Sequence, residues 1–283
     1  MSFNTYEHWV NAIDKDGTLC ISYGKDSLAC LRAIELLGWN IKRIVHAEVW
    51  ATDTISGNLP PMAEFKDKAD AIIKDRWGIE VEHLCATYKD GSKVTYEKEF
   101  YRVITEGSRE GEIVGFPFQR GAWCNSRLKM RALAKCKVKG VEFIGIASDE
   151  PKRFKVLTDT KLSPLRAIGW EEDLCGLWCQ YNDLLSPTYC DSCRDGCWFC
   201  HNQGVDQLRA LRKKYPDHWE LLLKWDKDSP VTFKADGHTV HDFDERFQLE
   251  DEGLIQPDKP FRWEMLNKPL QYNFLSDRWW NYE

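Results

Sequence analysis

The sequence predicts an α/β protein built on a doubly wound, mostly parallel sheet. Short apolar runs typical of strands alternate with patterns of helical spacing, in the order strand, helix, strand, helix, strand, across residues 19–21, 28–37, 41–49, 62–77 and 79–84. This rhythm indicates parallel strands joined by crossover helices. The 283 residues are 43% hydrophobic, which is enough for a full core. We expect a five-stranded Rossmann-like sheet, followed by a cysteine-rich helical C-terminal region.

The expected organisation is an α/β domain over residues 1–170 and a C-terminal region over residues 171–283. Further patterns predict a short helix, a fourth strand and two late helices, over residues 4–16, 141–147, 205–215 and 217–225. The final stretch, from about residue 261, is aromatic and polar with weak periodicity. We expect it either to wrap the core or to form a partner surface.

Composition excludes several classes of protein. The net charge of −6 argues against a globally basic nucleic-acid binder, although it leaves room for a local basic groove. No apolar run approaches the roughly 18 residues of a membrane span, and the N-terminus has no signal-peptide pattern. Eleven cysteines without a secretory signal favour reduced thiols or metal ligands over disulfides. We expect a cytoplasmic protein with no membrane partner; its oligomeric state is left open.

Residues 18–31 contain the stretch around which the chain is organised. The apolar run 19–21 leads into the polar turn 22–27, and a helical pattern follows at once. A strand, a polar turn and a helix N-terminus direct backbone N–H groups at one point, where the helix dipole favours an anion. The alternative is an ordinary capped turn. The turn is not a Walker A loop, because the G-x-x-x-x-G-K-[ST] spacing is absent.

The residue types in this turn suit phosphate binding. Gly24 lets the backbone approach a phosphate closely. Ser22 and Ser27 supply hydroxyl donors, and Lys25 supplies a positive charge. Asp26 either caps the helix or helps to hold a metal ion bound to phosphates.

Ends of later strands add candidate nucleotide contacts. In an open parallel sheet, ligands lie beyond the carboxyl ends of the strands. Glu48 ends the second predicted strand, where an acidic residue can bind ribose hydroxyls; Asp53 is an alternative for the same role. The plain reading of Glu48 is a surface carboxylate. Gly145, at the end of the fourth strand, can approach a nucleotide through its backbone.

Cationic and aromatic residues interleave between residues 86 and 122. They are Lys89, Lys93, Lys98, Arg102, Arg109 and Arg120, with Tyr88, Tyr96, Phe100, Tyr101 and Phe116. Such a mixture suits phosphate contacts combined with base stacking. An amphipathic helix with a solvated basic face explains it equally well. The segment 107–117 reads as a loop over the site.

Cys124 precedes a helical pattern that runs to Ala134. Arg127 and Lys129 follow it closely, and a cysteine at a helix N-terminus near cations has a lowered thiol pKa. Cys124 is therefore a candidate nucleophile or metal ligand. The alternative is a cysteine that is simply buried.

Residues 190–200 carry the pattern C-x2-C-x3-C-x2-C, formed by Cys190, Cys193, Cys197 and Cys200. Two C-x-x-C pairs this close together predict a metal centre, with a redox dithiol as the alternative. Four thiolates suit Zn²⁺, and dense cysteine runs also hold iron–sulfur clusters such as [4Fe-4S]. A second ligand set replaces Cys190 or Cys193 with Cys124. His201 is interpreted as a surface histidine, and Cys175 and Cys179 as core residues.

Taken together, these segments resemble the phosphoadenosine phosphosulfate (PAPS) reductase-like branch of the adenine nucleotide alpha-hydrolase, or PP-loop ATP pyrophosphatase, superfamily. The turn Ser22-Tyr23-Gly24-Lys25-Asp26-Ser27 is similar to its S-[GFY]-G-K-D-S loop. Residues 123–129 are similar to W-C-x-x-[RK]-L-K, residues 145–153 to G-[IV]-x-x-[DE]-E-x-x-R, and residues 194–200 to R-x-G-C-x-x-C. The order matches over residues 18 to about 225. The double cysteine pair also resembles the iron–sulfur protein of DNA phosphorothioation systems.

The resemblance implies that the loop holds the pyrophosphate of ATP with Mg²⁺. It implies catalytic roles for Lys25, Asp26, Cys124 and Glu150, in which Glu150 coordinates a metal or orients water. Arg153 would hold a phosphate; without the resemblance, residues 145–153 read as a capped turn. The implied reaction adenylylates a substrate and supports sulfur transfer. Nucleic acid, a small molecule and a sulfur-donor protein are candidate partners beside the adenine nucleotide.

Two other functions are compatible with the sequence. The first is a sulfonucleotide reductase that splits sulfite from PAPS or adenylyl sulfate (APS). Such reductases use a cysteine in a mobile C-terminal tail, whereas the last cysteine here is Cys200, and the tandem Cys-Cys of the iron–sulfur type is absent. The second is a non-catalytic nucleotide-binding module with a structural zinc ion.

Overall fold

The computed structural model describes residues 16–117, 121–136, 140–187, 189, 196–257 and 259–266. The chain forms two compact units, and both draw on separated segments. The first unit comprises Met1–Glu48, Asn58–Ser92 and Leu128–Asp195, and the second comprises Val49–Gly57, Lys93–Arg127 and Gly196–Glu283. The expected domain boundary at residue 170 stays a prediction. The helix expected over residues 4–16 and most of the aromatic C-terminal stretch lie outside the described residues.

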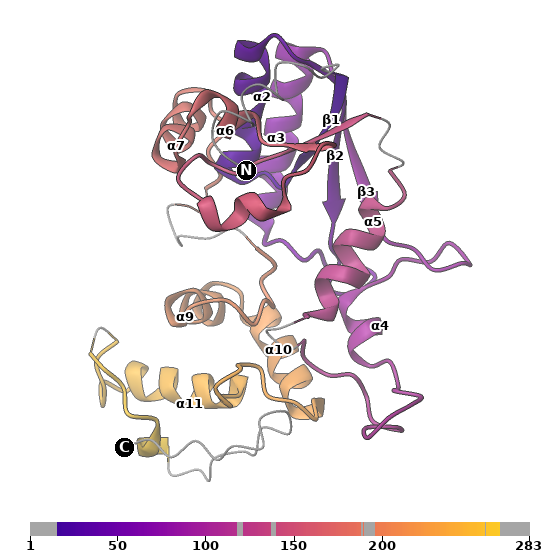
Figure 1. The fold of residues 1–283 in the computed structure, drawn as a ribbon. Coiled ribbons are helices and arrows are strands. Elements are labelled where there is room, and N and C mark those ends of the chain that lie inside the picture. The colour runs from indigo at the N-terminus through magenta and orange to yellow at the C-terminus, as the bar shows by residue number, and fades with distance from the viewer. Residues whose placement is uncertain are drawn as a thin grey trace. The chain divides into compact units, whose positions relative to one another are not determined.

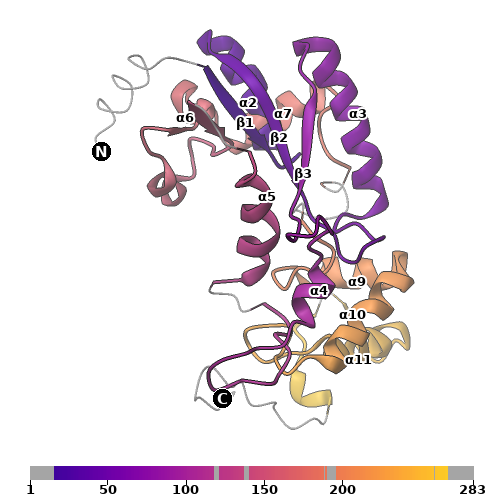
Figure 2. The ribbon, with the colours of Figure 1, turned by 90° about the vertical axis from the view of Figure 1, so that its right-hand side faces the viewer.

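The first unit is built on a five-stranded sheet in which every neighbouring pair of strands is parallel (Figures 1 and 2). The strand order is β3-β2-β1-β4-β5. The strands are β1 (Asp16–Ile21), β2 (Asn40–Glu48), β3 (Val81–Cys85), β4 (Val141–Ile144) and β5 (Lys161–Leu162). The predicted α/β class and parallel sheet are confirmed. Strand order reverses between β1 and β4, which is where open α/β sheets bind ligands.

Two crossover helices join the first three strands, as the sequence predicts. Helix α2 (Lys25–Leu37) follows β1, and helix α3 (Pro60–Trp77) follows β2. Both end at a glycine with a left-handed backbone, Gly38 at φ 65° and Gly78 at φ 69°. A residue with a Cβ pays a steric cost in this conformation, so glycine fixes where each helix ends.

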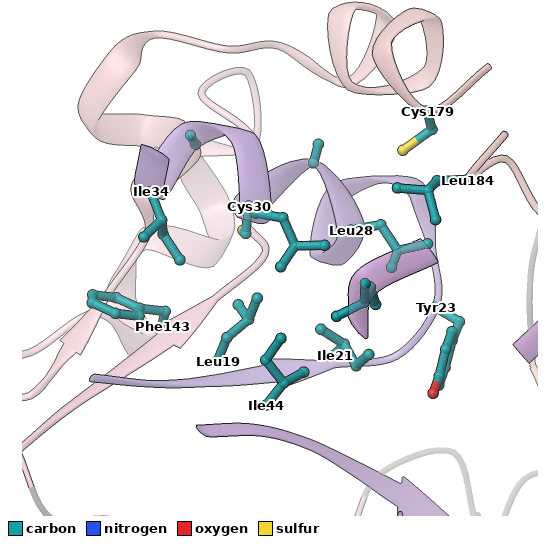
Figure 3. Close-up of a cluster of buried hydrophobic side chains, with 14 of the residues drawn as sticks. Leu19, Ile21, Tyr23, Leu28, Cys30, Ile34, Ile44, Phe143, Cys179 and Leu184 are labelled. Atoms are coloured by element: carbon teal, nitrogen blue, oxygen red, sulfur yellow. The ribbon is translucent and has the colours of Figure 1, made fainter. Parts of the chain in front are cut away.

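The core of the first unit lies between the sheet and α2. Figure 3 shows Leu19 and Ile21 of β1 pointing toward Leu28 of α2. Two short helices, α6 (Pro164–Ile168) and α7 (Glu172–Tyr181), pack against α2. Cys175 and Cys179 of α7 are fully buried in this cluster, which confirms that they are core residues.

Helices cover both faces of the sheet. Residues alternate along β1, so Cys20 points to the face opposite Leu19 and Ile21. There it interacts electrostatically with Cys136, which follows α5 (Arg131–Leu133). Helix α5 also contacts β2 and β3. Its first turns form a π-helix, η1 (Asn125–Met130), within the helix predicted to run from Cys124 to Ala134.

The second unit is mainly helical. Its elements are α4 (Tyr96–Phe100), α9 (Val205–Lys214), α10 (Pro216–Asp228), α11 (Val240–Asp251) and the short helix η3 (Trp263–Leu266). Helices α9 and α10 confirm the predictions over 205–215 and 217–225. Helix α11 was not predicted. Among the helices of the described residues, none combines the length and apolar character that a bilayer crossing needs.

An aromatic cluster forms much of the core of the second unit. The rings of Trp198 and Trp225 stack with centroids 5.5 Å apart, and Tyr96 lies 4.2 Å from Phe199 and 5.1 Å from Trp225. The Trp198 backbone N–H donates to the Gly57 carbonyl. All four rings are almost fully buried. This packing fixes Trp198 and Phe199, the two residues between Cys197 and Cys200.

Candidate functional site

The turn after β1 has one strained residue, and it is not the glycine. Tyr23 has a left-handed backbone with φ 62°, whereas Gly24 is extended at φ −73°. A Cβ added to Gly24 would lie 3.4 Å from Ser22 Oγ and 3.5 Å from Tyr189 Oη, which are ordinary contacts. A tyrosine in this conformation costs about 1–2 kcal/mol, so other contacts must hold it there.

Hydroxyl groups close the turn on itself. Ser27 Oγ donates to the Gly24 carbonyl at 2.9 Å and accepts the Ser22 backbone N–H at 3.1 Å. The Lys25 backbone N–H donates to the Tyr189 hydroxyl at 3.2 Å. Gly24 is the N-cap of α2, and no side chain caps the helix, so the interpretation of Asp26 as a helix cap is wrong. The first-turn N–H groups lack partners within the helix and suit an anion.

Lys25 and Asp26 form a charged pair at the start of α2. Lys25 Nζ lies 2.9 Å from Asp26 Oδ1 and 2.7 Å from Glu172 Oε2 of α7. Burial lowers the pKa of Lys25, but its hydrogen bonds to Glu172 and Asp26 outweigh burial and raise that pKa overall. Lys25 therefore keeps its positive charge at any physiological pH.

The Asp26 carboxylate is in a setting that suits a divalent cation. Burial raises the pKa of Asp26, and the charges of Glu172 and Glu150 raise it further. Together they outweigh Lys25, which lowers this pKa, so the net shift is upward. Oxygen ligands that repel one another are the kind that Mg²⁺ holds together. Among the described residues, no three carboxylate, histidine or cysteine side chains already form a metal site. Asp26 and Glu150 therefore fit the predicted ion by donor chemistry.

Gly145 brings the end of β4 against the start of α2. A Cβ on this residue would lie 2.7 Å from the backbone N and Cα of Ser27 and 2.9 Å from the carbonyl carbon of Asp26. Only glycine allows this approach without a shift of the backbone. The structure thus places the 22–27 turn beside the segment after β4, at the reversal of strand order. In that segment Glu150 accepts the Ala147 N–H and pairs with Arg153 at 2.6 Å.

Glu48 lies at the end of β2 and already has two cationic neighbours. Its Oε1 atom lies 2.7 Å from His83 Nδ1 and 2.9 Å from Lys66 Nζ. Burial raises the pKa of Glu48, but His83 and Lys66 lower it to about 2. The alternative ribose contact, Asp53, belongs to the second unit and pairs with Lys98 at 2.6 Å. Neither ribose assignment is tested by these contacts.

Sequence reasoning missed His83, Lys66 and Asp70 as neighbours of the candidate site. Each stands in a predicted helix or strand without a motif around it. His83 lies beside His46 only because β3 pairs with β2 in a particular register. No spacing rule gives that register in advance.

Three cysteines of the second unit border one buried tyrosine. Trp123 and Phe199, the neighbours of Cys124 and Cys200, pack on the Tyr96 ring at 5.0 and 4.2 Å. Burial raises the pKa of Tyr96 well above its usual value, and the charges of Cys124, Cys200 and Cys197 add to this. The fold therefore brings Cys124 near the second C-x-x-C pair. Cys190 and Cys193 lie outside the described residues, so both predicted ligand sets stay predictions.

Unpartnered polar atoms gather around this C-x-x-C pair. Of the six buried side-chain N or O atoms without a hydrogen-bond partner among the described residues, four belong to Tyr96 (Oη), His201 (Nδ1 and Nε2) and Gln203 (Oε1). The side-chain amide of Gln203 donates to the Cys197 carbonyl. His201 is only 6% exposed, so its interpretation as a surface histidine is wrong.

These surroundings fit a polar group held by the thiols. Buried polar atoms usually meet a partner, a water or an ion, and thiolates are preferred ligands of zinc and iron–sulfur centres. Within the described part of the chain, no three candidate ligands are assembled into a metal site. The donor types therefore agree with the predicted metal centre, while its ligand set is still open.

The base-stacking interpretation of residues 86–122 is wrong for three of its aromatic residues. Tyr96, Phe100 and Phe116 are at most 1% exposed and pack within the core of the second unit. Several of the cations are paired with carboxylates: Lys98 with Asp53, Arg102 with Glu99, and Arg109 with Glu112. This segment therefore serves mainly to build the second unit. Its stretch 107–117 is a loop, and its predicted place over the site stays a prediction.

Comparisons with known proteins find a likeness among solved structures. No family model matches the chain, and no curated protein matches it. Among solved structures, the chain is similar to the U34-tRNA thiolase NcsA from Methanococcus maripaludis, in a structure with its [4Fe-4S] cluster. The two chains are 14% identical; the match covers 79% of this chain and 78% of that chain, with a TM-score of 0.38. A likeness at this level assigns no activity, substrate or cofactor to this protein.

Proposed function

We propose that this protein is an ATP-binding PP-loop enzyme that adenylylates a substrate with release of pyrophosphate and supports sulfur transfer to a nucleic acid or a small molecule. The observation that carries the proposal is the 22–27 turn. It lies at the reversal of strand order, it leads into a helix without a side-chain cap, and Gly145 holds it against the end of β4. These features agree with a site for the phosphates of a nucleotide.

The proposed chemistry is a displacement at the α-phosphorus of ATP. An oxygen of the substrate attacks, and the bond to pyrophosphate breaks. Lys25 offsets the charge of the phosphates, and Arg153 binds a phosphate oxygen. Asp26 and Glu150 would hold Mg²⁺, which supplies further charge neutralisation on the leaving pyrophosphate. Glu48 contacts the ribose.

The cysteine thiols are proposed to carry the sulfur step. Cys190, Cys193, Cys197 and Cys200 would hold a [4Fe-4S] cluster or a zinc ion, and Cys124 lies near the second pair. Tyr96, Trp198 and Phe199 beside these thiols are nearly inaccessible, whereas Cys124, Cys197 and Cys200 are partly exposed, so a substrate can reach them.

The test is ATP binding by equilibrium dialysis with Mg²⁺, together with pyrophosphate release. Lys25→Ala is expected to lower pyrophosphate release on the order of 100-fold, as loss of a charged donor at a reacting phosphate does. The matched control is Lys74→Ala, which removes a lysine from an exposed pair with Glu80 at 2.6 Å on the same unit. The control should keep wild-type binding and release.

Other results would redirect or end the proposal. Release of sulfite from an adenylyl sulfate, without pyrophosphate from ATP, would identify a sulfonucleotide reductase. ATP binding without turnover, in a protein with a full complement of zinc, would identify a nucleotide-binding module. Absence of any ATP binding by the wild-type protein would contradict the nucleotide site itself.

A further inference from the structure

A chain of hydrogen bonds begins at the strained residue of the 22–27 turn. The Tyr23 hydroxyl donates to Asp70 Oδ1 of α3 at 2.5 Å and lies 3.2 Å from His83 Nε2 of β3. The same His83 nitrogen lies 2.7 Å from Asp70 Oδ2. The Tyr23 side chain is fully buried (Figure 3). The turn is thus tied through one side chain to two elements beyond β1.

The chain of contacts continues through His83 to the end of β2. His83 Nδ1 lies 2.7 Å from Glu48 Oε1. The same carboxylate oxygen accepts from Lys66 Nζ at 2.9 Å. Lys66 is 5% exposed and also donates to Asn58 Oδ1 at 2.8 Å. Each partner of this buried lysine is therefore an acceptor.

The contacts then return to β1. The third partner of Lys66 Nζ is His46 Nε2, at 2.9 Å, and His46 Nδ1 lies 2.9 Å from the carbonyl oxygen of Ile21. Ile21 is the last residue of β1. The network consequently holds the chain at two points, the Ile21 carbonyl and the Tyr23 hydroxyl, on either side of Ser22.

The two histidines have different protonation states in this arrangement. His46 must be neutral with its proton on Nδ1, because that nitrogen faces a carbonyl and Nε2 accepts from Lys66. Burial and the charge of Lys66 lower the pKa of His46 to about 4. In contrast, both nitrogens of His83 face carboxylates, and hydrogen bonds to Asp70 and Glu48 raise the pKa of His83 to about 9.

We propose that His83, supported by Asp70 and Glu48, is a positioning residue that keeps the 22–27 turn in its phosphate-binding shape. The inference rests on the nucleotide site proposed above. His83 does not touch the turn's backbone; it acts through the Tyr23 hydroxyl. Without it, the left-handed conformation of Tyr23 loses a contact that offsets its steric cost, and the turn relaxes. The same imidazolium joins the turn to Glu48, the candidate ribose contact.

The first test is the affinity for ATP of His83→Gln, a neutral variant that cannot hold both carboxylates. Its dissociation constant is expected to rise about tenfold, the usual effect of losing one hydrogen bond to a charged group. Tyr23→Phe should give a similar rise. The double variant, His83→Gln with Tyr23→Phe, should have a dissociation constant little higher than either single variant, because both changes remove the same contact. The control is His241→Gln, which breaks a histidine–carboxylate pair of 2.6 Å with Asp226 in the second unit.

A pH profile separates positioning from simple loss of stability. The groups that face the network are Asp67, Asp70 and Lys66 from α3, Glu48 and His46 from β2, and Tyr23 from the turn. Because the pKa of His83 is raised to about 9, His83 loses its charge as the pH rises through this value, and the wild-type affinity for ATP should fall there. The affinity of His83→Gln should not change there. Asp70→Asn keeps an acceptor for the Tyr23 hydroxyl but removes one of the carboxylates that raise the pKa of His83. The affinity of this variant for ATP should therefore begin to fall at a lower pH than that of the wild type.

Hydrogen–deuterium exchange decides the inference without any ligand. In nucleotide-free protein, His83→Gln should speed exchange of the backbone amides of residues 22–28 and leave α7 unchanged. Equal exchange in wild type and variant would overturn the inference, as would ATP affinities that do not differ. A wild-type protein that binds no ATP, yet shows faster exchange in the variant, would end the proposed function but retain the role of His83 in the turn.

Discussion

Gly145 is the residue on which the approach of β4 to the 22–27 turn depends. Gly145→Ala would place a methyl group 2.7 Å from the Ser27 backbone. We expect it to lower the free energy of unfolding by about 1–3 kcal/mol, because a backbone shift must relieve the overlap. We also expect ATP binding to weaken more than stability alone explains, since the shift occurs in the turn. Urea denaturation and equilibrium dialysis measure the two effects.

A matched control exists in the same unit. Gly176 lies within α7, and a Cβ there would meet only Lys25 Cδ, at 3.6 Å. Gly176→Ala should therefore raise stability by about 0.5–1 kcal/mol, because alanine is favoured in helix interiors. If Gly145→Ala proved as harmless as this control, the close approach would not matter for the site.

Residue chemistry could be predicted from sequence better than residue conformation. The turn and its position after β1 follow from local pattern, whereas the packing of Gly145 against the Ser27 backbone was not predicted: Gly145 was expected to approach a nucleotide. The left-handed backbone of Tyr23 was not predicted, because the network at the Tyr23 hydroxyl holds it and no local rule contains that network. His201 was misread for the same reason: its burial depends on packing across the second unit.

At the scale of elements, the cap of α11 offers a direct test of local energetics. The Thr239 hydroxyl accepts the Asp242 N–H at 3.1 Å, and the Asp242 carboxylate accepts the Thr239 N–H at 2.8 Å. Thr239→Ala should cost about 1 kcal/mol of stability, the usual loss for an N-cap. Thr239→Ser should restore most of it. Urea denaturation of both variants measures this. If Thr239→Ser lost as much stability as Thr239→Ala, the stability would depend on the methyl group of Thr239 rather than on its capping hydroxyl.

Elements with strong periodicity and clear ends could be predicted; short or irregular ones could not. Helices α2, α3, α9 and α10 have apolar spacing and, in most cases, a proline start or a glycine end. Strand β5 has two residues, too few for any alternation to be visible. Helix α11 carries a capping signal at Thr239, but its acidic sequence hides the apolar face formed by Val240, Phe243 and Phe247.

At the scale of the whole molecule, the two units are not contiguous in sequence. Cys124 reaches the second unit with residues 93–127, while Cys197 and Cys200 come from the segment after residue 195. The C-x-x-C pairs were visible in the sequence, but the approach of Cys124 to Tyr96 depends on this interleaving. The sequence therefore predicted two ligand sets, and a measurement of bound metal is needed to choose between them.

Metal content of cysteine variants makes that choice. Four thiolates within eleven residues can converge on one centre without help from a distant segment. We therefore expect anaerobically purified Cys190→Ser and Cys193→Ser to lose iron and acid-labile sulfide, or zinc, as fully as Cys200→Ser, while Cys124→Ser retains the metal. Cys85→Ser, in β3 of the first unit, is the control and should match wild type. Metal analysis and the absorbance spectrum report the result. Loss of metal in Cys124→Ser, with retention in Cys190→Ser or Cys193→Ser, would instead assign the centre to the thiols around Tyr96, and the buried tyrosine hydroxyl would then face the bound group.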